Sequence, residues 1–404
     1  MNAKPADSLS ELHVDVVVLG GGVAGLWCRW AAERAGLRVL LIESQRMGAG
    51  QTILAQGIVH RGVKYAISPS ASEAAQAADR AASIWRAAMG RGPAVSDATP
   101  NLRSVRVLAD SMLMWSDAGL LSRGVAFAAS KVLSSSVRPA TPAEIPPVLR
   151  SAGTVYHVDE AVVAPRSLLR VLAEQGSGPL HHAAVDSIHV ASDHVTIRSS
   201  ALRVRAQCVV LAAGEGNADL LRLAGADESG SEAWMQRRPL HMAYVRNAPC
   251  ELFGHWIGTI SDKPRLTITS DRVGDEIVWY LGGEVAESGV AFGEAEQQER
   301  VRRELAACFP RMSWATAQIR TVRVNRAEGF QADGRRPDLP VVRSRDRLIA
   351  VWPTKMVLAP LAAAEVVRAV QALGVVGGGA WRAGGFDVNP VDYAWSPWTP
   401  PDQS

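Results

Sequence analysis

The sequence of 404 residues predicts an α/β fold, α+β overall, in which a Rossmann-like domain is interrupted by an antiparallel-sheet domain. Three observations lead to this prediction. An apolar strand, a glycine-rich turn, a helix and a second strand follow one another between residues 15 and 43. Two later stretches, residues 165–213 and 347–373, again combine apolar strands with helices. The segments between them carry β-branched and aromatic residues separated by turn signals, which is typical of an antiparallel sheet.

The first α/β stretch consists of strand 15–19, an Ala-rich helix over 23–35 that ends before Gly36, and strand 38–43. Beyond it, the capping box Ser70-x-x-Glu73 predicts a helix that runs to residue 89.

The other two α/β stretches have similar signals. A helix begins at Pro165 and runs to residue 174, and it is followed by strands over 185–190, 195–197 and 207–213. Strand 347–352 then leads into a helix over 360–373, with Pro at its start and Gly374 just past its end. The antiparallel sheet is predicted from strands near 242–245, 265–269 and 276–281, with a helix over 294–308.

Composition excludes several classes of protein. The 43 Lys and Arg against 40 Asp and Glu leave a net charge of +3, too small for a basic nucleic-acid binder. The longest apolar run, residues 16–28, is too short to span a bilayer, and the first 12 residues do not have the pattern of a secretory signal. Four cysteines lie far apart without a C-x-x-C pair, so we expect no metal site of that kind and a cytoplasmic location.

The turn after the first strand has the sequence Gly20-Gly-Gly22-Val23-Ala24-Gly25, which satisfies G-x-G-x-x-G in the required strand-turn-helix context. Gly20 permits the tight turn, Gly22 lets a pyrophosphate approach the backbone, and Gly25 lets helix and strand pack closely. Glu43 ends the next strand, where a carboxylate accepts hydrogen bonds from ribose hydroxyls. The pattern therefore predicts a bound dinucleotide, FAD or NAD rather than NADP.

Further motifs resemble the D-amino-acid-oxidase-like flavoproteins, which include glycerol-3-phosphate dehydrogenase, L-2-hydroxyglutarate dehydrogenase and glycine oxidase. Residues 50–65 end in Val59-His60-x-Gly62-x-x-Tyr65, similar to the segment that runs under the flavin in the two dehydrogenases. Asp159-Glu160, Pro165–Leu169, Val209–Gly214 and Arg336-Pro-Asp-Leu-Pro340 resemble later family segments in the same order.

This resemblance implies FAD as cofactor and an inserted substrate domain. The FAD-binding domain is expected to be discontinuous, over residues 10–92, 155–226 and 330–385, with the substrate domain over 93–154 and 227–329 and tails over 1–9 and 386–404. The expected cofactor contacts are Gly20, Gly22, Val23, Ala24, Gly25, Glu43, Ser44, Gln51, Thr52, Gln56, Gly57, Val185, Ala213, Gly214, Arg336, Thr354, Lys355 and Met356. His60 stands in a His-x-Gly spacing rather than the His-x-x-Gly of relatives with covalent flavin, so we expect non-covalent FAD.

The expected chemistry is hydride transfer from a substrate carbon to flavin N5. His60 is the candidate base, although it could instead contact the substrate or pack under the flavin. Arg61 and Arg265 are candidates to bind an anionic group, and Tyr280 could hydrogen-bond the substrate or belong to the core. Lys355 would stabilise negative charge on the reduced flavin. No metal site is expected.

Together these features predict an FAD-dependent oxidoreductase that oxidises a small, polar, anionic substrate with a C–OH group, such as a 2-hydroxy acid or a polyol phosphate. Oxidation of an amine or amino acid is the alternative, because the wider family divides between the two. A flavin- or NAD-binding protein without turnover is a third reading. The expected partners are the small-molecule substrate and an electron acceptor, either oxygen or a quinone-type carrier, with no nucleic acid and no transmembrane segment.

Overall fold

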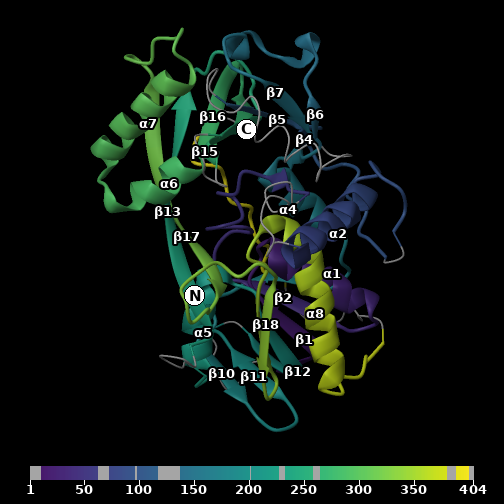
Figure 1. The fold of residues 1–404 in the computed structure, drawn as a ribbon. Helices are drawn as coiled ribbons and strands as arrows, with labels where there is room; N and C mark the ends of the chain where they lie inside the picture. Colours follow the sequence, from purple (N-terminus) through teal and green to yellow (C-terminus); the bar gives the residue numbers. More distant parts are fainter. Residues whose placement is uncertain are drawn as a thin grey trace.

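A twisted, largely parallel sheet forms one half of the molecule (Figure 1). The computed structural model describes residues 11–61, 72–95, 98–116, 137–200, 202–226, 233–257, 264–379 and 388–399. Gly62, Tyr65 and Ser70 of the predicted motifs lie outside these residues, as do Lys64 and Lys263, two further candidates to bind an anionic group. The strands of this first sheet are β1 (Glu11–Leu19), β2 (Val39–Glu43), β9 (Leu180–His182), β10 (Ser187–Val190), β11 (Val195–Arg198), β12 (Arg203–Leu211), β18 (Val341–Arg345) and β19 (Leu348–Trp352).

The order of the first sheet follows from its parallel centre. Strand β1 pairs in parallel with β12 on one side and with β2 on the other, and β9 extends the sheet beyond β2. The other edge of β12 is shared, because β11 pairs antiparallel with its first half and β19 pairs parallel with its second half. Strands β10 and β18 complete the two antiparallel hairpins.

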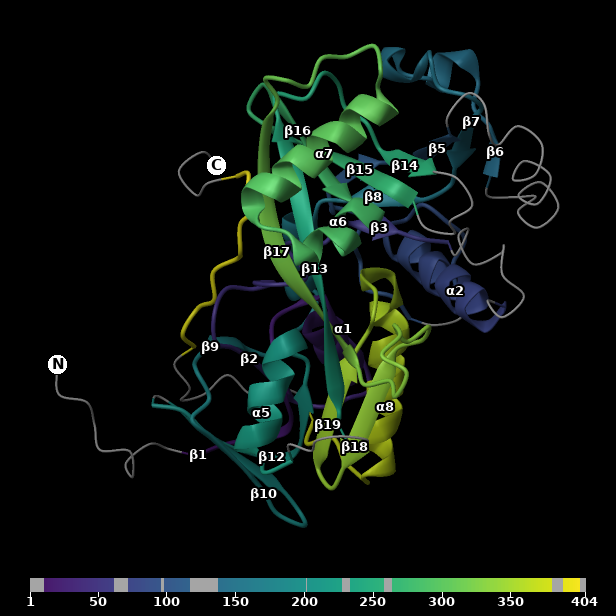
Figure 2. The ribbon, with the colours of Figure 1, turned by 60° about the vertical axis from the view of Figure 1, so that its left-hand side comes forward.

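Helices cover both faces of the first sheet, which explains why its strands are continuous apolar runs rather than alternating ones. Helices α1 (Val23–Arg34) and α8 (Ala359–Ala372) lie on one face, and α5 (Asn217–Leu223) lies on the other (Figure 2). In β1, Val16 and Val18 belong to the core under α1 and α8, whereas Val17 and Leu19 belong to the core that contains Leu221 of α5.

Within the residues that the structure describes, the second sheet has eight strands in the order β17-β13-β16-β15-β14-β5-β7-β6. Their bounds are β5 (Met112–Ser116), β6 (Val137–Pro139), β7 (Val155–Val158), β13 (Met235–Arg246), β14 (Gly254–Ile257), β15 (Pro264–Val273), β16 (Glu276–Gly282) and β17 (Gln318–Gly329). Helix α7 (Glu294–Cys308) has the predicted bounds, and it packs on this sheet through Val301, Leu305 and Cys308.

Two features of the second sheet differ from expectation. The sheet is not purely antiparallel, since β14 pairs in parallel with β5. Strand β7 pairs with β5 and β6, although residue 155 was expected to begin the second part of the FAD-binding domain. The physical reason is burial, because Val155 packs in the same core as Trp115 of β5.

A small sheet of β3 (Ile58–Val59), β8 (Ala161–Val163) and β4 (Val107–Ala109) accompanies the two large ones. The remaining helices are α2 (Ser72–Ala88), α4 (Pro165–Ala173) and α6 (Glu284–Ser288), and the 3₁₀ turns are η4 (Pro142–Glu144), η5 (Pro147–Leu149), η6 (Gly214–Gly216), η8 (Gly289–Ala291) and η9 (Met356–Leu358). No helix in the described part of the chain is both long and apolar enough to cross a membrane.

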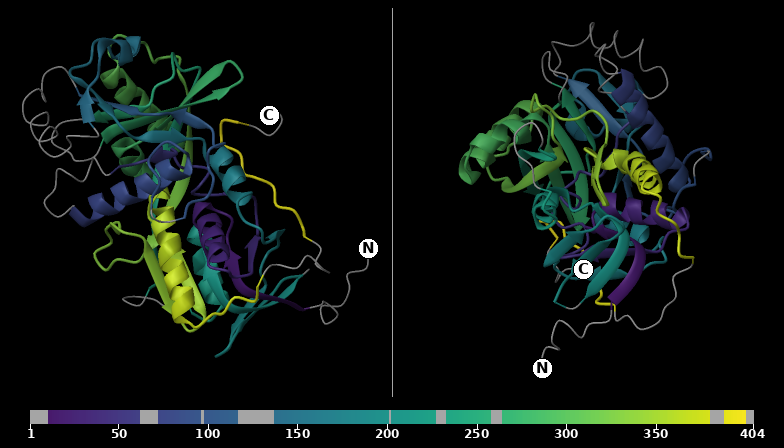
Figure 3. Two further views of the ribbon diagram at one scale, coloured as in Figure 1. Left: turned by 90° about the vertical axis from the view of Figure 1, so that its right-hand side faces the viewer. Right: turned by 90° about the horizontal axis from the view of Figure 1, so that it is seen from below.

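The C-terminal segment 388–399 joins the two halves from outside (Figure 3). At one end, the side-chain amide of Asn389 donates to the carbonyl of His182 in β9 across 2.8 Å. At the other end, the Trp398 ring packs on Tyr280 of the second sheet, with centroids 4.7 Å apart, and its indole N–H donates to Asp271. This segment belongs to the predicted C-terminal tail, and its strand pairing is an isolated bridge between Met47 and Tyr393.

Candidate active site

The glycine turn between β1 and α1 has the geometry that the fingerprint predicts. Gly20 has φ +113°, a conformation that favours glycine, and a Cβ atom on Gly25 would lie 1.9 Å from the Gly20 carbonyl oxygen. Helix α1 begins at this turn without a side-chain cap, so its positive dipole end faces the space in front of the turn. The N–H of Gly21 donates to Glu43 Oε2 across 2.6 Å, which ties the turn to the end of β2.

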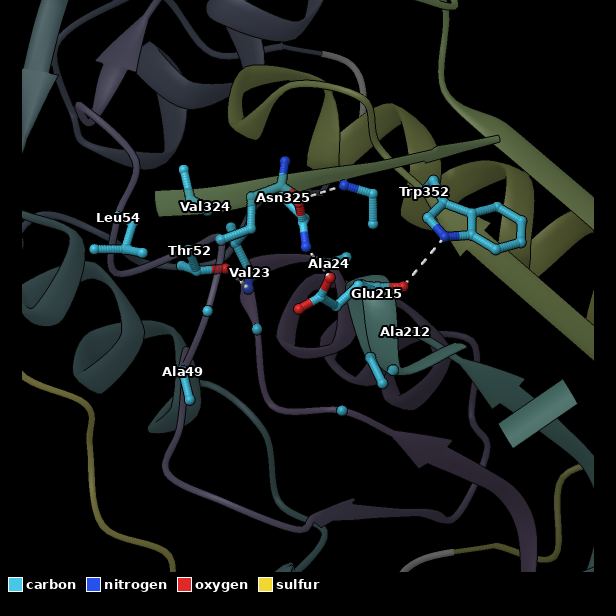
Figure 4. A pocket seen from close by; sticks show the side chains of 18 of the residues that line it. Val23, Ala24, Ala49, Thr52, Leu54, Ala212, Glu215, Val324, Asn325 and Trp352 are labelled. Carbon is cyan, nitrogen blue, oxygen red and sulfur yellow. Dashed lines mark hydrogen bonds between the residues drawn. The ribbon is translucent and has the colours of Figure 1, made fainter. Parts of the chain in front are cut away.

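A first cavity of about 620 Å³ opens in front of this turn (Figure 4). Thr52 lies on its wall and accepts a hydrogen bond from the Val23 N–H at 3.2 Å. On the wall from the second sheet, the Asn325 amide donates to Glu215 Oε2 across 2.8 Å. The predicted cofactor residues that line this cavity are Gly20, Gly22, Val23, Ala24, Glu43, Ser44, Gln51, Thr52, Ala213, Gly214, Lys355 and Met356.

A second cavity of about 320 Å³ adjoins the first. The residues common to both walls are Gln51, Leu54, Ala55, Val324, Lys355 and Met356. Four further predicted residues line the second cavity only, namely Gln56, Gly57, His60 and Arg336. The two cavities therefore form one continuous site that runs from the glycine turn to His60.

Charged side chains of both signs line the second cavity. Arg326 of β17 donates to Glu287 of α6 across 3.1 Å, and both residues lie on the cavity wall. Burial and the neighbouring Arg238 lower the pKa of Arg326 from its usual value, while Glu287 acts in the opposite direction. The same cavity is lined by Arg336, Lys355 and Glu284. A small substrate with an anionic group would find guanidinium donors here.

His60 leaves the end of β3 and meets a carboxylate that precedes β8. His60 Nδ1 lies 3.0 Å from Glu160 Oε2, and the backbone N–H of Arg61 donates to Glu160 Oε1 across 3.2 Å. A second histidine, His255 of β14, places Nε2 3.5 Å from the same Glu160 oxygen. The two imidazole rings are nearly parallel, with centroids 6.1 Å apart.

Burial distinguishes the members of this group. The side chains of Glu160 and His255 are only 1% and 3% exposed, whereas that of His60 is 26% exposed. Burial alone would raise the pKa of Glu160, but the charges and hydrogen bonds of His60 and His255 outweigh it and hold that pKa well below its usual range. Glu160 is therefore an anion at neutral pH. Among the described residues, these three also form the one group whose ligand atoms lie close enough to hold a metal ion, within 4.8 Å of one another.

Three candidate catalytic residues do not line either cavity. Arg61 pairs with Asp159 at 2.6 Å and with Asp79 at 3.1 Å. Arg265 pairs with Glu304 of α7 at 2.7 Å, and its guanidinium lies over the Trp256 ring. Tyr280 belongs to the core and donates its hydroxyl to the Leu54 carbonyl across 2.8 Å. Carboxylates bind Arg61, a carboxylate and an aromatic ring contact Arg265, and a backbone carbonyl accepts from Tyr280. The structure therefore does not bring these three polar groups to the cavities.

Three predicted cofactor residues are also absent from the cavity walls. Gly25 acts through helix packing, as described above. Val185 packs at the edge of the core on the α5 face of the first sheet. Thr354 is buried with φ +66°, and its hydroxyl donates to the Leu339 carbonyl across 3.0 Å, which shapes the turn before Lys355.

A model of the family described as FAD dependent oxidoreductase (DAO) matches residues 15–394. The chain belongs to this family of FAD-dependent oxidoreductases. The resemblance inferred from the motifs is thus confirmed, and FAD is the cofactor.

Relatives of known sequence or structure agree with this membership. The chain is 38% identical over 371 residues to the "Probable FAD-dependent oxidoreductase PA4991" of Pseudomonas aeruginosa, covering 90% of this chain and 92% of that protein. The crystal structure of PA4991 has a TM-score of 0.78 and 33% identity, covering 96% of this chain and 98% of the other.

More distant structures share the fold. Glycine oxidase from Geobacillus kaustophilus has a TM-score of 0.63 at 17% identity, and L-alpha-glycerophosphate oxidase from Mycoplasma pneumoniae, solved with FAD bound, has 0.61 at 15% identity. In each case the match covers 89% of this chain and 95% of the other. The predicted fold class is therefore confirmed.

The first cavity fits the FAD of this family. Its volume lies within the range of roughly 300–1,000 Å³ that is usual for cofactor sites. Glycine at position 22 keeps the backbone open, since a Cβ atom there would lie 3.1 Å from Thr52 Oγ1. The uncapped start of α1 suits a diphosphate, and the Glu43 carboxylate suits ribose hydroxyls.

Several residues of the site were not among the predicted ones. Glu160 appeared only as part of a family motif, yet the fold brings both Glu160 and His255 to His60. Glu284 and Glu287 line the second cavity without any local motif that marks them. The one available signal was at Glu160, an acidic residue directly before the apolar strand Ala161–Val163.

Proposed function

We propose that this enzyme oxidises a C–OH group of a small anionic molecule, such as a 2-hydroxy acid or a polyol phosphate. FAD, when bound, accepts the hydride from the substrate carbon. Gln51, Lys355 and Met356, which are common to both cavities, would hold the cofactor near the second cavity, where the substrate would bind.

The observation that carries this proposal is the pairing of His60 with the buried Glu160 carboxylate on the wall of the second cavity. Removal of hydride from a carbon that bears a hydroxyl is easier when the hydroxyl proton leaves to a base. An imidazole oriented by a carboxylate suits this task. An alcohol keeps its hydroxyl proton at neutral pH and always needs such a base, whereas an amine needs one only when it binds as an ammonium, so we take the pair to favour an alcohol substrate.

Cations in the second cavity support an anionic substrate. Arg336 offers a guanidinium that can bind a carboxylate or phosphate through two hydrogen bonds, and Lys355 offers a point charge. We assign the main anion contact to Arg336, which lines the second cavity.

One observation favours a second candidate, oxidation of an amine or amino acid. Glu284 and Glu287 lie three residues apart on α6 and both line the second cavity. Their carboxylates could bind the ammonium group of a zwitterionic substrate, while Arg336 binds its carboxylate. The related structures do not decide between the two candidate functions, because they include both a glycine oxidase and a glycerophosphate oxidase.

The deciding experiment is anaerobic bleaching of the flavin band of the purified holoenzyme by 2-hydroxy acids, polyol phosphates and amino acids. We expect a 2-hydroxy acid or polyol phosphate to bleach it fastest. Faster bleaching by an amino acid would establish the second candidate, and no bleaching by any compound would point to a binding protein without turnover. Reoxidation by air or by a soluble quinone then identifies the acceptor, for which we propose oxygen or a quinone-type carrier.

We also propose the division into domains predicted above, with residues 93–154 and 227–329 as the substrate domain, to which residues 155–158 are added because β7 pairs within its sheet. A cytoplasmic location remains part of the proposal. It is supported by the four cysteines, which are all free thiols, three of them buried. Fractionation of cells that express the tagged protein tests the location.

A further inference from the structure

We propose that Glu160 and His255 are positioning residues that fix His60 as the Nδ1–H tautomer, so that Nε2 is the nitrogen that accepts the substrate proton. This inference rests on the proposed function and assigns its base to one atom. It comes from three side chains that are far apart in sequence, at positions 60, 160 and 255, and that meet at one buried carboxylate.

The tautomers follow from the hydrogen-bond network. An ionised carboxylate can only accept, so the ring nitrogen 3.0 Å from Glu160 Oε2 must carry a hydrogen, and that nitrogen is His60 Nδ1. In the neutral ring the basic nitrogen is then Nε2. In the proton transfer the substrate O–H bond breaks and an N–H bond forms at His60 Nε2. The two electrons of the O–H bond stay on the substrate oxygen.

His255 completes the support from the opposite side. Its Nε2 faces Glu160 Oε2 at 3.5 Å, longer than an ordinary N–H···O bond but close enough for a strong electrostatic contact in a buried site. Its Nδ1 lies 2.9 Å from the Thr267 hydroxyl. With Nε2 protonated, Nδ1 accepts from that hydroxyl. The orientation of His255 is thereby set from β15, and the Glu160 carboxylate is held between two histidines.

The arrangement is more specific than burial of a charge requires. The Arg61 N–H already donates to Glu160 Oε1, while both histidine rings contact Oε2. Of the two rings, only His60 lines the second cavity. His255 is buried behind Glu160, so it acts on the substrate only through the carboxylate and His60.

Other charged groups also face His60 across the second cavity, and their contribution must be separated from that of Glu160. These groups are Glu284, Glu287, Arg326, Arg336 and Lys355. None of them is changed in the variants below, so they form a constant background.

The experiment is ¹⁵N NMR of the histidine rings in the FAD-loaded enzyme, combined with stopped-flow flavin reduction as a function of pH. The variants are Glu160→Gln and His255→Gln, with His60→Gln and His255→Gln also used to assign the two rings. His241→Gln is the matched control, because His241 is likewise buried, contacts a threonine hydroxyl at 2.9 Å, and lines neither cavity.

We expect wild-type His60 to be the Nδ1–H tautomer and to lose this single tautomer in Glu160→Gln, where the amide can donate as well as accept. Flavin reduction should slow about 10²-fold or more in Glu160→Gln and about tenfold in His255→Gln, with KM changed less than threefold. In Glu160→Gln the acid limb of the rate profile should move to lower pH, because the imidazolium loses its buried counter-charge. The control should match the wild type in every readout.

An Nε2–H tautomer in the wild type would overturn the proposal, as would an unchanged pH profile and rate in Glu160→Gln. Stoichiometric zinc, manganese or iron in the purified enzyme would also overturn it, since the three side chains would then be metal ligands. If Glu160→Gln fails to fold, the tautomer of wild-type His60 and the rate of flavin reduction in His255→Gln still test the proposal. If no alcohol bleaches the flavin but the tautomer is as stated, the proposed function fails and the positioning network stands.

Discussion

The backbone N–H of Gly21 lies 2.6 Å from Glu43 Oε2, so the carboxylate at the end of β2 is a direct hydrogen-bond acceptor for the glycine turn. The other oxygen of this carboxylate accepts from the Gln45 N–H at 2.7 Å. Glu43 therefore organises two backbone segments that border the first cavity, in addition to its expected contact with the ribose of FAD.

Glu43→Ala should weaken FAD binding about 10- to 100-fold, because hydrogen bonds to a charged group contribute roughly 1.5–3 kcal/mol. Titration of the apoprotein with FAD measures the change. The FAD affinity of Glu43→Gln should fall between those of the wild type and Glu43→Ala, since its amide oxygen can still accept from the Gly21 N–H. Glu365→Ala, at an exposed position of α8, is the control, and an equal effect there would refute the assignment.

Gly25→Ala should destabilise the protein and reduce its FAD content, because the new Cβ atom would lie 1.9 Å from the Gly20 carbonyl, and backbone cannot move aside cheaply. We expect the free energy of unfolding in urea to fall by about 1–3 kcal/mol or more. Gly293→Ala, whose Cβ would enter open space, should change it little. A Gly25→Ala protein with wild-type stability and full yellow colour would contradict the packing described here.

The flavin should be released by acid precipitation, with the yellow colour in the supernatant. The reason is that His60 stands in a His-x-Gly spacing rather than the His-x-x-Gly of relatives with covalent flavin, and that its Nδ1 is engaged by Glu160 at 3.0 Å. Absorbance of pellet and supernatant after precipitation measures the distribution. Colour that stays with the pellet, and with the peptide that contains residue 60 after digestion, would show a covalent flavin.

Arg336→Leu should raise the KM for the anionic substrate about 10- to 100-fold, because it removes a guanidinium from the second cavity. Arg336→Lys should recover only part of the affinity, since an ammonium cannot make the same paired hydrogen bonds. Arg265→Leu should leave KM unchanged, because Arg265 pairs with Glu304 outside both cavities. Steady-state kinetics with the best substrate measures all three, and the reverse order of effects would restore Arg265 as the anchor.

Asp15 should make the stability of the first sheet sensitive to acid. Burial by itself raises the pKa of this carboxyl, but Arg38 and the N–H groups of Gly378 and Arg38 outweigh it, so the folded-state pKa lies below the ordinary value. The unfolded chain thus binds a proton more readily. The stability that Asp15 contributes is therefore present above about pH 4 and is lost as pH falls through the folded-state pKa.

Asp15→Asn should accordingly lower the free energy of unfolding at pH 7 by about 1–3 kcal/mol, and by less at pH 3.5. Urea unfolding at both pH values measures the difference. Asp275→Asn, in the exposed turn between β15 and β16, is the control and should have no effect. An equal loss of unfolding free energy at both pH values would show that Asp15 stabilises the fold through packing rather than through its charge.

Much of the fold was predictable because its signals are local. The strand, turn and helix over residues 15–35 each depend on neighbours within a few positions, and the predicted bounds of α7 agree with the observed Glu294–Cys308. The parallel pairing of β14 with β5 was not predictable in this way, because β14 follows β5 by more than 130 residues in the chain and neither strand carries a motif.

The sequence by itself determined the cofactor half of the site. A dinucleotide site depends on glycines and an acid within one continuous βαβ unit, so chain order alone brings Gly20, Gly25 and Glu43 together. Tertiary structure decided the second cavity, where we propose that the substrate binds. Whether an arginine or a histidine reaches the cavity depends on which opposite charge lies nearest in space, and this is why Arg265 turns to Glu304 while His60 meets Glu160 and His255.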